Sequence, residues 1–192
     1  MRLVIAAAFL ATLAPPLARA DEEAPRGVAG DVAPRRPMPI APAIKVGPPA
    51  EVAALGKRVV GRFTCKGNTI QPDGSSQPLV AKITTKLELD GAWIVTTLVE
   101  TTSKLKWTEY RTYDATAKQW TRFQLVNTTA SVQSTSLGEQ NGTWNWTGTA
   151  TSPQGTVQLR DHEQVGVKQR KLWGEALLAG TWQKTYEVTC TR

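Results

Sequence analysis

Charged side chains recur in this sequence at positions that share a period of two with large apolar residues. Glu109 and Arg111 are in phase with Trp107. Arg122 is likewise in phase with Trp120. Further charged residues placed in this way are Asp161, Glu163 and Lys184. Alternate residues of a β-strand lie on one face, and a charge on a buried face is costly unless it is paired or hydrated. The pattern therefore predicts a cluster of polar groups inside a β-structure or at its opening.

Such a cluster among aromatic residues is typical of a ligand site, because binding cavities combine an apolar wall with a few convergent polar groups. The candidate ligand-binding residues are Trp107, Glu109, Arg111, Trp120, Arg122, Asp161, Glu163 and Lys184. The expected ligand is small and apolar or amphipathic, with an anionic head group as one option. Two alternatives stay open. The inward charges form purely structural ion pairs, or a β-bulge reverses the face of the residues beyond it.

The residue types give little support for metal binding, haem ligation or nucleophilic catalysis. Asp161, His162 and Glu163 are adjacent, and adjacent strand residues face opposite ways, so they cannot converge on a metal or a proton. His162 is the only histidine, and alternation turns it outward, which favours a surface role over haem ligation. Both cysteines are expected to be structural, so no nucleophile has a base beside it. We expect no catalytic residue, no metal and no cofactor.

The N-terminus has the three parts of a secretory signal peptide. A basic start, Met1-Arg2, precedes an apolar stretch from residue 3 to 14, and Ala18-Arg19-Ala20 supplies a small-residue cleavage site. We expect cleavage after Ala20 and a periplasmic or secreted protein. No later window approaches the ~20 apolar residues that span a bilayer, so no transmembrane segment is expected.

The remaining chain divides into a linker and one domain. Residues 21–49 are rich in Pro, Ala and charge, a composition that favours a disordered tether. Residues 50–192 have the length of one domain with a single core. Removal of residues 1–20 lowers the formal charge from +7 to +5, since it takes away two arginines and no acid. The basic residues are scattered rather than gathered in a stripe, so no nucleic-acid partner is expected.

The domain is predicted to be all-β, an antiparallel up-and-down meander of nine or ten strands closed into a barrel. Apolar and polar residues alternate in segment after segment, and dipeptides such as Asp90-Gly91 and Asn141-Gly142 mark tight turns. One short helix is expected over 49–55, ending at Gly56 or continuing weakly to Gly61. Strands are expected over 62–70, 81–89, 92–95, 104–113, 119–127, 130–137, 143–150, 156–165 and 181–191.

The two cysteines support closure of the sheet. Cys65 lies in the first expected strand and Cys190 in the last, both in phase with apolar residues. In a closed sheet these strands are neighbours, so we expect a disulfide, as is common in exported chains. A loop of this length is expected to stabilise the fold by about 4 to 5 kcal/mol on the chain-entropy model. A two-sheet sandwich with an intersheet disulfide is the alternative.

Three stretches carry a resemblance to a known architecture. They are Leu55-Gly56, Leu89-Asp90-Gly91-Ala92-Trp93, and Tyr110-Arg111-Thr112-Tyr113-Asp114 followed by Lys118-Gln119-Trp120. Over residues 52–126 the chain resembles uncharacterised bacterial families with a calycin-like, or lipocalin-like, barrel. It departs from classical lipocalins in having Gly61-Arg62-Phe63 where they have a Gly-x-Trp signature. The resemblance implies a barrel with a central cavity and no established activity.

Three functions are compatible with these features. The leading hypothesis is an exported lipocalin-like binding protein for a small, partly apolar ligand. The second is an envelope interaction or structural protein with a filled barrel and no small-molecule ligand. The third is a barrel enzyme that uses Asp161 or Glu163 for proton transfer, which we consider less fitting than a protein without enzymatic activity.

Overall fold

The computed structural model describes residues 47–192, one short helix followed by eleven strands. The predicted signal peptide and residues 21–46 of the predicted linker lie outside the described residues. The helix α1 comprises Ala50–Val59. The strands are β1 (Gly61–Ile70), β2 (Ser76–Glu88), β3 (Trp93–Glu100), β4 (Lys106–Asp114), β5 (Gln119–Val126), β6 (Ser131–Ser136), β7 (Glu139–Gln140), β8 (Thr143–Ser152), β9 (Gly155–Val165), β10 (Gln169–Leu178) and β11 (Thr181–Thr191). Among these residues, no helix has the length and apolar character needed to cross a membrane.

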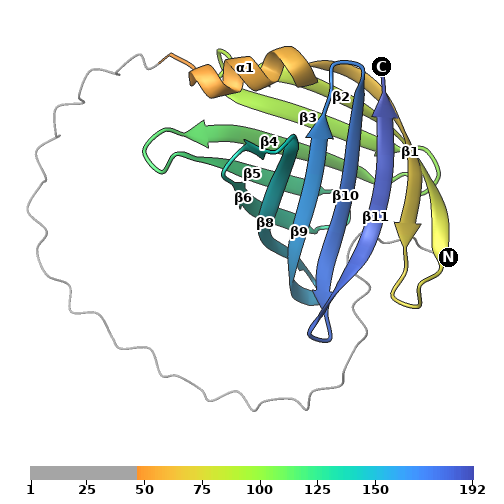
Figure 1. Ribbon diagram of the computed structural model, residues 1–192. Helices are drawn as coiled ribbons and strands as arrows, with labels where there is room; N and C mark the ends of the chain where they lie inside the picture. The colour runs from red at the N-terminus through yellow and green to blue at the C-terminus, as the bar shows by residue number, and fades with distance from the viewer. Residues whose placement is uncertain (1–46) are drawn as a thin grey trace, which may run out of the picture. The chain divides into compact units, whose positions relative to one another are not determined.

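Ten of the described strands form one closed antiparallel barrel (Figure 1). Strands β1 to β6 pair in sequence order, and so do β8 to β11. Two further pairings close the sheet, β1 with β11 and β6 with β8. The two-residue strand β7 pairs only with the start of β8. The predicted up-and-down barrel is confirmed, and the continuous ladder rules out the two-sheet sandwich.

The turn signals in the sequence correspond to tight turns in the structure. Asn141 and Gly142 join β7 to β8 with φ angles of 51° and 78°. A type I′ turn requires positive φ at both central residues, and Asn-Gly adopts this conformation readily. Asp90 and Gly91 also have positive φ, at the turn between β2 and β3. These turns fix the register of the hairpins on either side.

Strand β10 is absent from the strands predicted from the sequence. Its inward positions are occupied by Arg170, Leu172, Gly174 and Ala176. A charge, a glycine and an alanine on the inner face hide the usual alternation. Gly174 is required there, since a Cβ atom on it would lie 2.2 Å from Cε1 of Tyr186.

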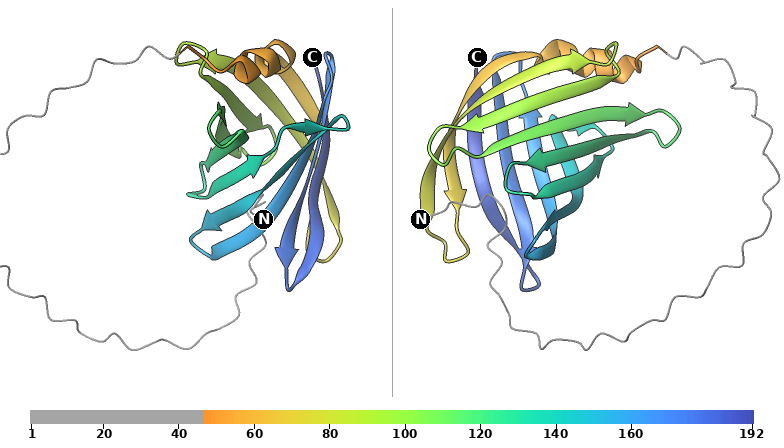
Figure 2. Two further views of the ribbon diagram at one scale, coloured as in Figure 1. Left: turned by 60° about the vertical axis from the view of Figure 1, so that its left-hand side comes forward. Right: turned by 180° about the vertical axis from the view of Figure 1, so that it is seen from behind.

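The helix α1 lies across one end of the barrel, as both views of Figure 2 show. Its buried side chains, Val52, Leu55 and Val59, join a cluster inside this end. The other members of the cluster are Ile94, Trp120, Trp144, Trp146 and Val165. The indole rings of Trp144 and Trp146 are stacked, with centroids 5.9 Å apart. We call this end the closed end, because large side chains fill it.

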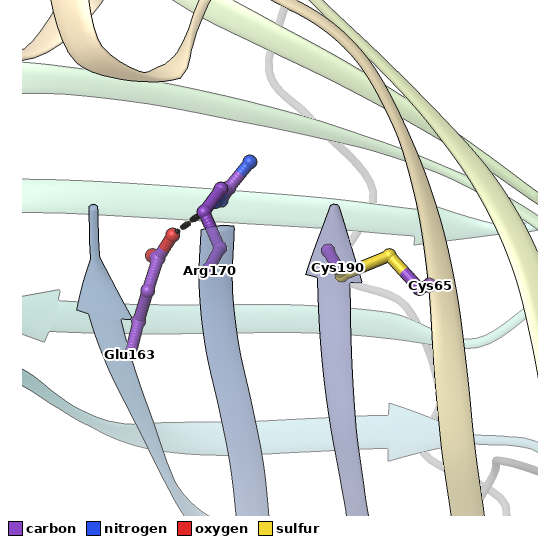
Figure 3. The surroundings of a disulfide bond; sticks show 4 residues. All are labelled: Cys65, Glu163, Arg170 and Cys190. Atoms are coloured by element: carbon purple, nitrogen blue, oxygen red, sulfur yellow. Dashed lines mark hydrogen bonds and ion pairs between the residues drawn. A yellow bond between two sulfur atoms is a disulfide. The ribbon is translucent and has the colours of Figure 1, made fainter. Parts of the chain in front are cut away.

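Cys65 and Cys190 lie directly opposite each other on β1 and β11 and form a disulfide (Figure 3). The predicted disulfide is confirmed. It links residues 125 positions apart, so it ties together the first and last strands of the barrel. Both cysteines are fully buried in a second apolar cluster, with Phe63, Leu79, Ala81, Ile83, Leu98 and Val188.

Closure between β6 and β8 depends on a glycine. Gly148 pairs with Ser134, and a Cβ atom at Gly148 would lie 2.0 Å from the carbonyl oxygen of Gln133. Since the contact is with backbone, a side chain here would push the two strands apart. We expect Gly148→Val to lower the free energy of unfolding by about 2 to 3 kcal/mol, measured by urea unfolding. Thr149→Val on the neighbouring exposed position is the control. Equal stabilities of the two variants would show that the pairing of β6 with β8 tolerates a side chain at position 148.

Candidate functional site

A layer of six charged side chains crosses the interior of the barrel, and we call it the charged layer. It contains three arginines and three carboxylates: Arg111, Arg122, Arg170, Glu109, Asp161 and Glu163. They come from β4, β5, β9 and β10, and each residue is between 1% and 8% exposed. The alternation of each strand turns them inward, and barrel closure brings them together. Their formal charges cancel.

Glu163 lies between two of the arginines. Its Oε2 accepts a hydrogen bond of 2.6 Å from Nη1 of Arg111. Its Oε1 accepts one of 2.7 Å from Nε of Arg170 (Figure 3). Arg111 also donates from Nε to Glu109. Both oxygens of Glu163 are therefore occupied by guanidinium groups, the geometry that makes a buried ion pair strong.

Arg122 and Asp161 form the second half of the layer. Arg122 donates from Nε to Oγ of Ser134 at 2.7 Å and from Nη2 to Oδ2 of Asp161. The other oxygen of Asp161 accepts a hydrogen bond of 3.1 Å from the hydroxyl of Tyr186. Nη1 of Arg122 lies 3.9 Å from Oε2 of Glu109, which is beyond hydrogen-bonding distance. This nitrogen of Arg122 and Nη1 of Arg170 both lack a hydrogen-bond partner among the described residues.

The layer rests on Trp146 of the closed end, which has no solvent exposure. The guanidinium carbons of Arg111 and Arg122 lie 5.3 Å and 4.8 Å from the centroid of its ring. Cations over an indole face are attracted by its quadrupole, more strongly where water is excluded. Trp146 therefore stabilises two of the three arginines through cation–π contacts.

The environment fixes the protonation of two groups in the layer. Burial disfavours the ionised form of Glu163, but the charges and hydrogen bonds of Arg111 and Arg170 outweigh it and lower its pKa to about 2. Burial, together with the negative charge of Asp161, raises the pKa of Tyr186 well above its usual value. At neutral pH Glu163 is an anion, and the Tyr186 hydroxyl keeps its proton.

A cavity of about 190 Å³ lies on the other side of the charged layer from α1. Its wall is apolar and includes Leu79, Ile83, Leu98, Trp107, Val132, Val157, Leu159, Leu172, Leu178 and Val188. Its polar floor is formed by Glu109, Arg111, Arg122, Gln124, Asp161 and Tyr186. Gln71 and Pro72, from the loop between β1 and β2, line the cavity at the barrel end remote from α1. The interior is therefore filled on one side of the layer and hollow on the other.

The structure places most of the predicted ligand residues in or near this cavity. Trp107 belongs to the wall, while Glu109, Arg111, Arg122 and Asp161 belong to the floor. Glu163 lies within the charged layer but does not line the cavity. Trp120 points inward as expected, but it packs against Trp144 in the closed end, so it does not reach the cavity.

Lys184 departs from its predicted inward position. The register between β10 and β11 shifts after Gly174, which pairs with Tyr186, because Glu175 then pairs with Lys184 and Thr185 has no partner. This bulge reverses the face of the strand beyond it. Lys184 is among the residues that line the cavity, but its ammonium pairs with Glu187 and its side chain is 42% exposed.

Several residues of the site were not among the predicted ligand residues. They are Gln124, Ser134, Trp146, Arg170 and Tyr186. Gln124 and Tyr186 carry the same alternation signal as the residues that were predicted. Arg170 could not be found in this way, since its strand was not recognised.

His162 lies on the outer face of β9, where its ring stacks on Trp173 with centroids 5.1 Å apart. Its Nδ1 is 2.7 Å from Oδ1 of Asn145. Among residues 47–192, no three His, Cys, Asp or Glu side chains gather in a way that could hold a metal ion.

Comparison with known proteins finds no family model and no curated protein that matches this chain. The function is therefore argued from the cavity and the charged layer.

The lowered pKa of Glu163 predicts a pH-dependent stability. A carboxyl with a depressed pKa stabilises the fold above its ordinary pKa of 4.5, and this stabilisation is lost as the pH falls toward 2. We expect Glu163→Gln to be about 3 kcal/mol less stable than the wild type near pH 6 and to approach it near pH 2. Urea unfolding followed by tryptophan fluorescence measures both values.

The control is Glu139→Gln, which removes the half-exposed ion pair with Arg58. Solvent screens such a pair, so its loss should change stability by less than about 1 kcal/mol. A constant difference between Glu163→Gln and the wild type from pH 6 to pH 2 would contradict the assigned ionisation of Glu163.

Proposed function

We propose that this protein is an exported binding protein for a small, partly apolar ligand, held in a calycin-like barrel. The observation that carries the proposal is the cavity with apolar walls and a polar floor. Such a site obtains affinity from the apolar surface that the ligand buries and orientation from a few fixed polar groups. The strands of the barrel supply the polar floor and most of the apolar wall.

The floor is organised before a ligand arrives. Arg122 is fixed by Ser134 and Asp161, and Asp161 is fixed by Tyr186. The hydrogen-bonded seams of the barrel and the disulfide hold these strands in place. A preformed site loses little conformational entropy on binding, which favours affinity for small molecules.

The other two functions have less support. A filled barrel leaves no interior space, whereas about 190 Å³ is open here. Glu163 is a poor proton-transfer group because its pKa is near 2 and both its oxygens accept hydrogen bonds from arginines. Both oxygens of Asp161 are likewise engaged, by Arg122 and Tyr186.

Export is supported by the sequence and by the disulfide together. The apolar N-terminal stretch and the site after Ala20 have the pattern of a signal peptide. Disulfides persist mainly in oxidising compartments, such as the periplasm or the extracellular space. The proposed location is therefore periplasmic or secreted.

Native mass spectrometry of the chain, produced in a bacterial host that exports it, tests the proposal. The expected species begins at Asp21, contains the disulfide and carries a small non-covalent ligand. Ala176→Phe should abolish ligand retention, because Ala176 lines the cavity and is 5% exposed. Thr149→Phe on the outer face is the matched control.

The proposal fails if the exported, folded protein carries no ligand and gives no saturable tryptophan fluorescence change with a panel of small apolar compounds. Retention of residues 1–20 in the exported protein would contradict the assigned signal peptide but not the binding site. Circular dichroism of both variants shows that the barrel has formed.

A further inference from the structure

We infer that the cavity selects an uncharged ligand, a single ring or short chain with one hydroxyl or amide group placed against Arg122 and Gln124. The inference rests on the proposed binding function and names its ligand class. The sequence allowed a ligand with an anionic head group, and the present inference excludes it. The argument uses the charge, the hydrogen bonds and the volume of the site.

The charged layer leaves no net charge for a ligand to neutralise. Each carboxylate of the layer contacts at least one of its three arginines, and the numbers of positive and negative groups are equal. A carboxylate or ammonium group brought to this floor would be a buried charge without a counterion. The effective penalty for such an ion is several kcal/mol, which a small ligand cannot offset.

The hydroxyl at the floor adds no charge, since Tyr186 stays protonated over the physiological pH range. Two further charged residues line the cavity, Glu175 and Lys184, and each already has a partner. Glu175 pairs with Arg160, and Lys184 pairs with Glu187. The residues that line the floor therefore favour neutral molecules.

Two polar atoms at the floor have hydrogen-bonding capacity left. Nη1 of Arg122 is a donor that lies 3.9 Å from the nearby Glu109 oxygen. Gln124 donates from Nε2 to Glu109 at 2.6 Å, and its Oε1 accepts no hydrogen bond from the described residues. A hydroxyl or amide both accepts and donates, so it can satisfy both atoms. A carboxylate would accept from Arg122 but would face the oxygens of Gln124 and Glu109.

The volume limits the size of the ligand. An apolar cavity of about 150 Å³ holds a benzene molecule. The present cavity, at about 190 Å³, is slightly larger. It suits one ring with a short substituent, roughly eight non-hydrogen atoms on the same scale.

Four probes of one shape separate these possibilities: benzyl alcohol, benzoate, benzylamine and toluene. Dissociation constants are measured with the disulfide-bonded mature protein at neutral pH by NMR titration. Benzyl alcohol is expected to bind at least about tenfold more tightly than benzoate and benzylamine, because each ion would be buried without a counterion. It is expected to bind about fivefold more tightly than toluene, because toluene leaves the polar atoms of Arg122 and Gln124 without a hydrogen bond.

Variants of Gln124 assign the head-group position. Gln124→Leu should abolish the preference for benzyl alcohol over toluene while changing the toluene affinity by less than about twofold, because only the polar contact is removed. Gln124→Glu places an uncompensated negative charge at the floor and should make benzylamine the preferred probe, which provides a second test if the leucine variant does not fold. Leu125→Gln, at an exposed position on the same strand, is the control and should change none of these preferences.

Each outcome has a distinct meaning. If benzoate or benzylamine binds as tightly as benzyl alcohol, the charge argument is wrong, although the protein remains a small-molecule binder. If toluene binds as tightly as benzyl alcohol, the assignment of the head group to the floor is wrong. If the folded protein binds none of the four, the proposed binding function at this cavity is overturned with the inference.

Discussion

The six charges of the charged layer neutralise one another inside the barrel, and the rest of the structure depends on this constraint. Removing an ion from water is so costly that each guanidinium and carboxylate needs a partner within contact distance. The ion pair between Arg111 and Glu163 joins β4 to β9, and the pair between Arg122 and Asp161 joins β5 to β9. These partners are distant in the sequence and meet only across the closed barrel. Closure of the sheet and compensation of the charges therefore depend on each other.

The charged layer divides the interior into two parts with different roles. Toward α1, tryptophan rings and the apolar face of the helix fill the space, and Trp146 contacts the arginines directly. On the other side most of the wall is aliphatic, and space remains. One side of the charged layer contacts the packed closed end, and the other side forms the floor of the cavity. A neutral floor of this kind provides hydrogen bonds without attracting ions.

Period-two alternation, together with the turn dipeptides and the two cysteines, predicted the barrel and its disulfide. Alternation also identified Trp107 and several of the charged residues that line the cavity. Glu109, Arg111 and Arg122 were identified because a charge in phase with tryptophan is rare on a buried face. Alternation gives the face of a residue but not its height along the barrel axis. Trp120 therefore has the predicted orientation yet belongs to the closed end.

The remaining departures have local causes. Lys184 lies just before a bulge at Thr185, where one extra residue on β11 reverses the face of the strand, and no residue type in that segment indicates the bulge. Arg170 lies on β10, whose inner face has one large apolar residue, Leu172, beside a charge, a glycine and an alanine. The positions of both residues depend on how neighbouring strands pair, which the local sequence does not encode.

The central claim is that the charged layer is a preformed neutral floor that offers a ligand an unpaired donor at Arg122. NMR of the arginine side-chain Nε–H and Nη–H groups, recorded during a titration with benzyl alcohol, tests this claim most directly. The account predicts slowly exchanging signals for Arg111, Arg122 and Arg170 in the free protein, with a ligand-dependent shift at Arg122 and little change at Arg170. Rapidly exchanging arginine signals in the free protein, or a titration in which Arg170 shifts and Arg122 does not, would contradict it.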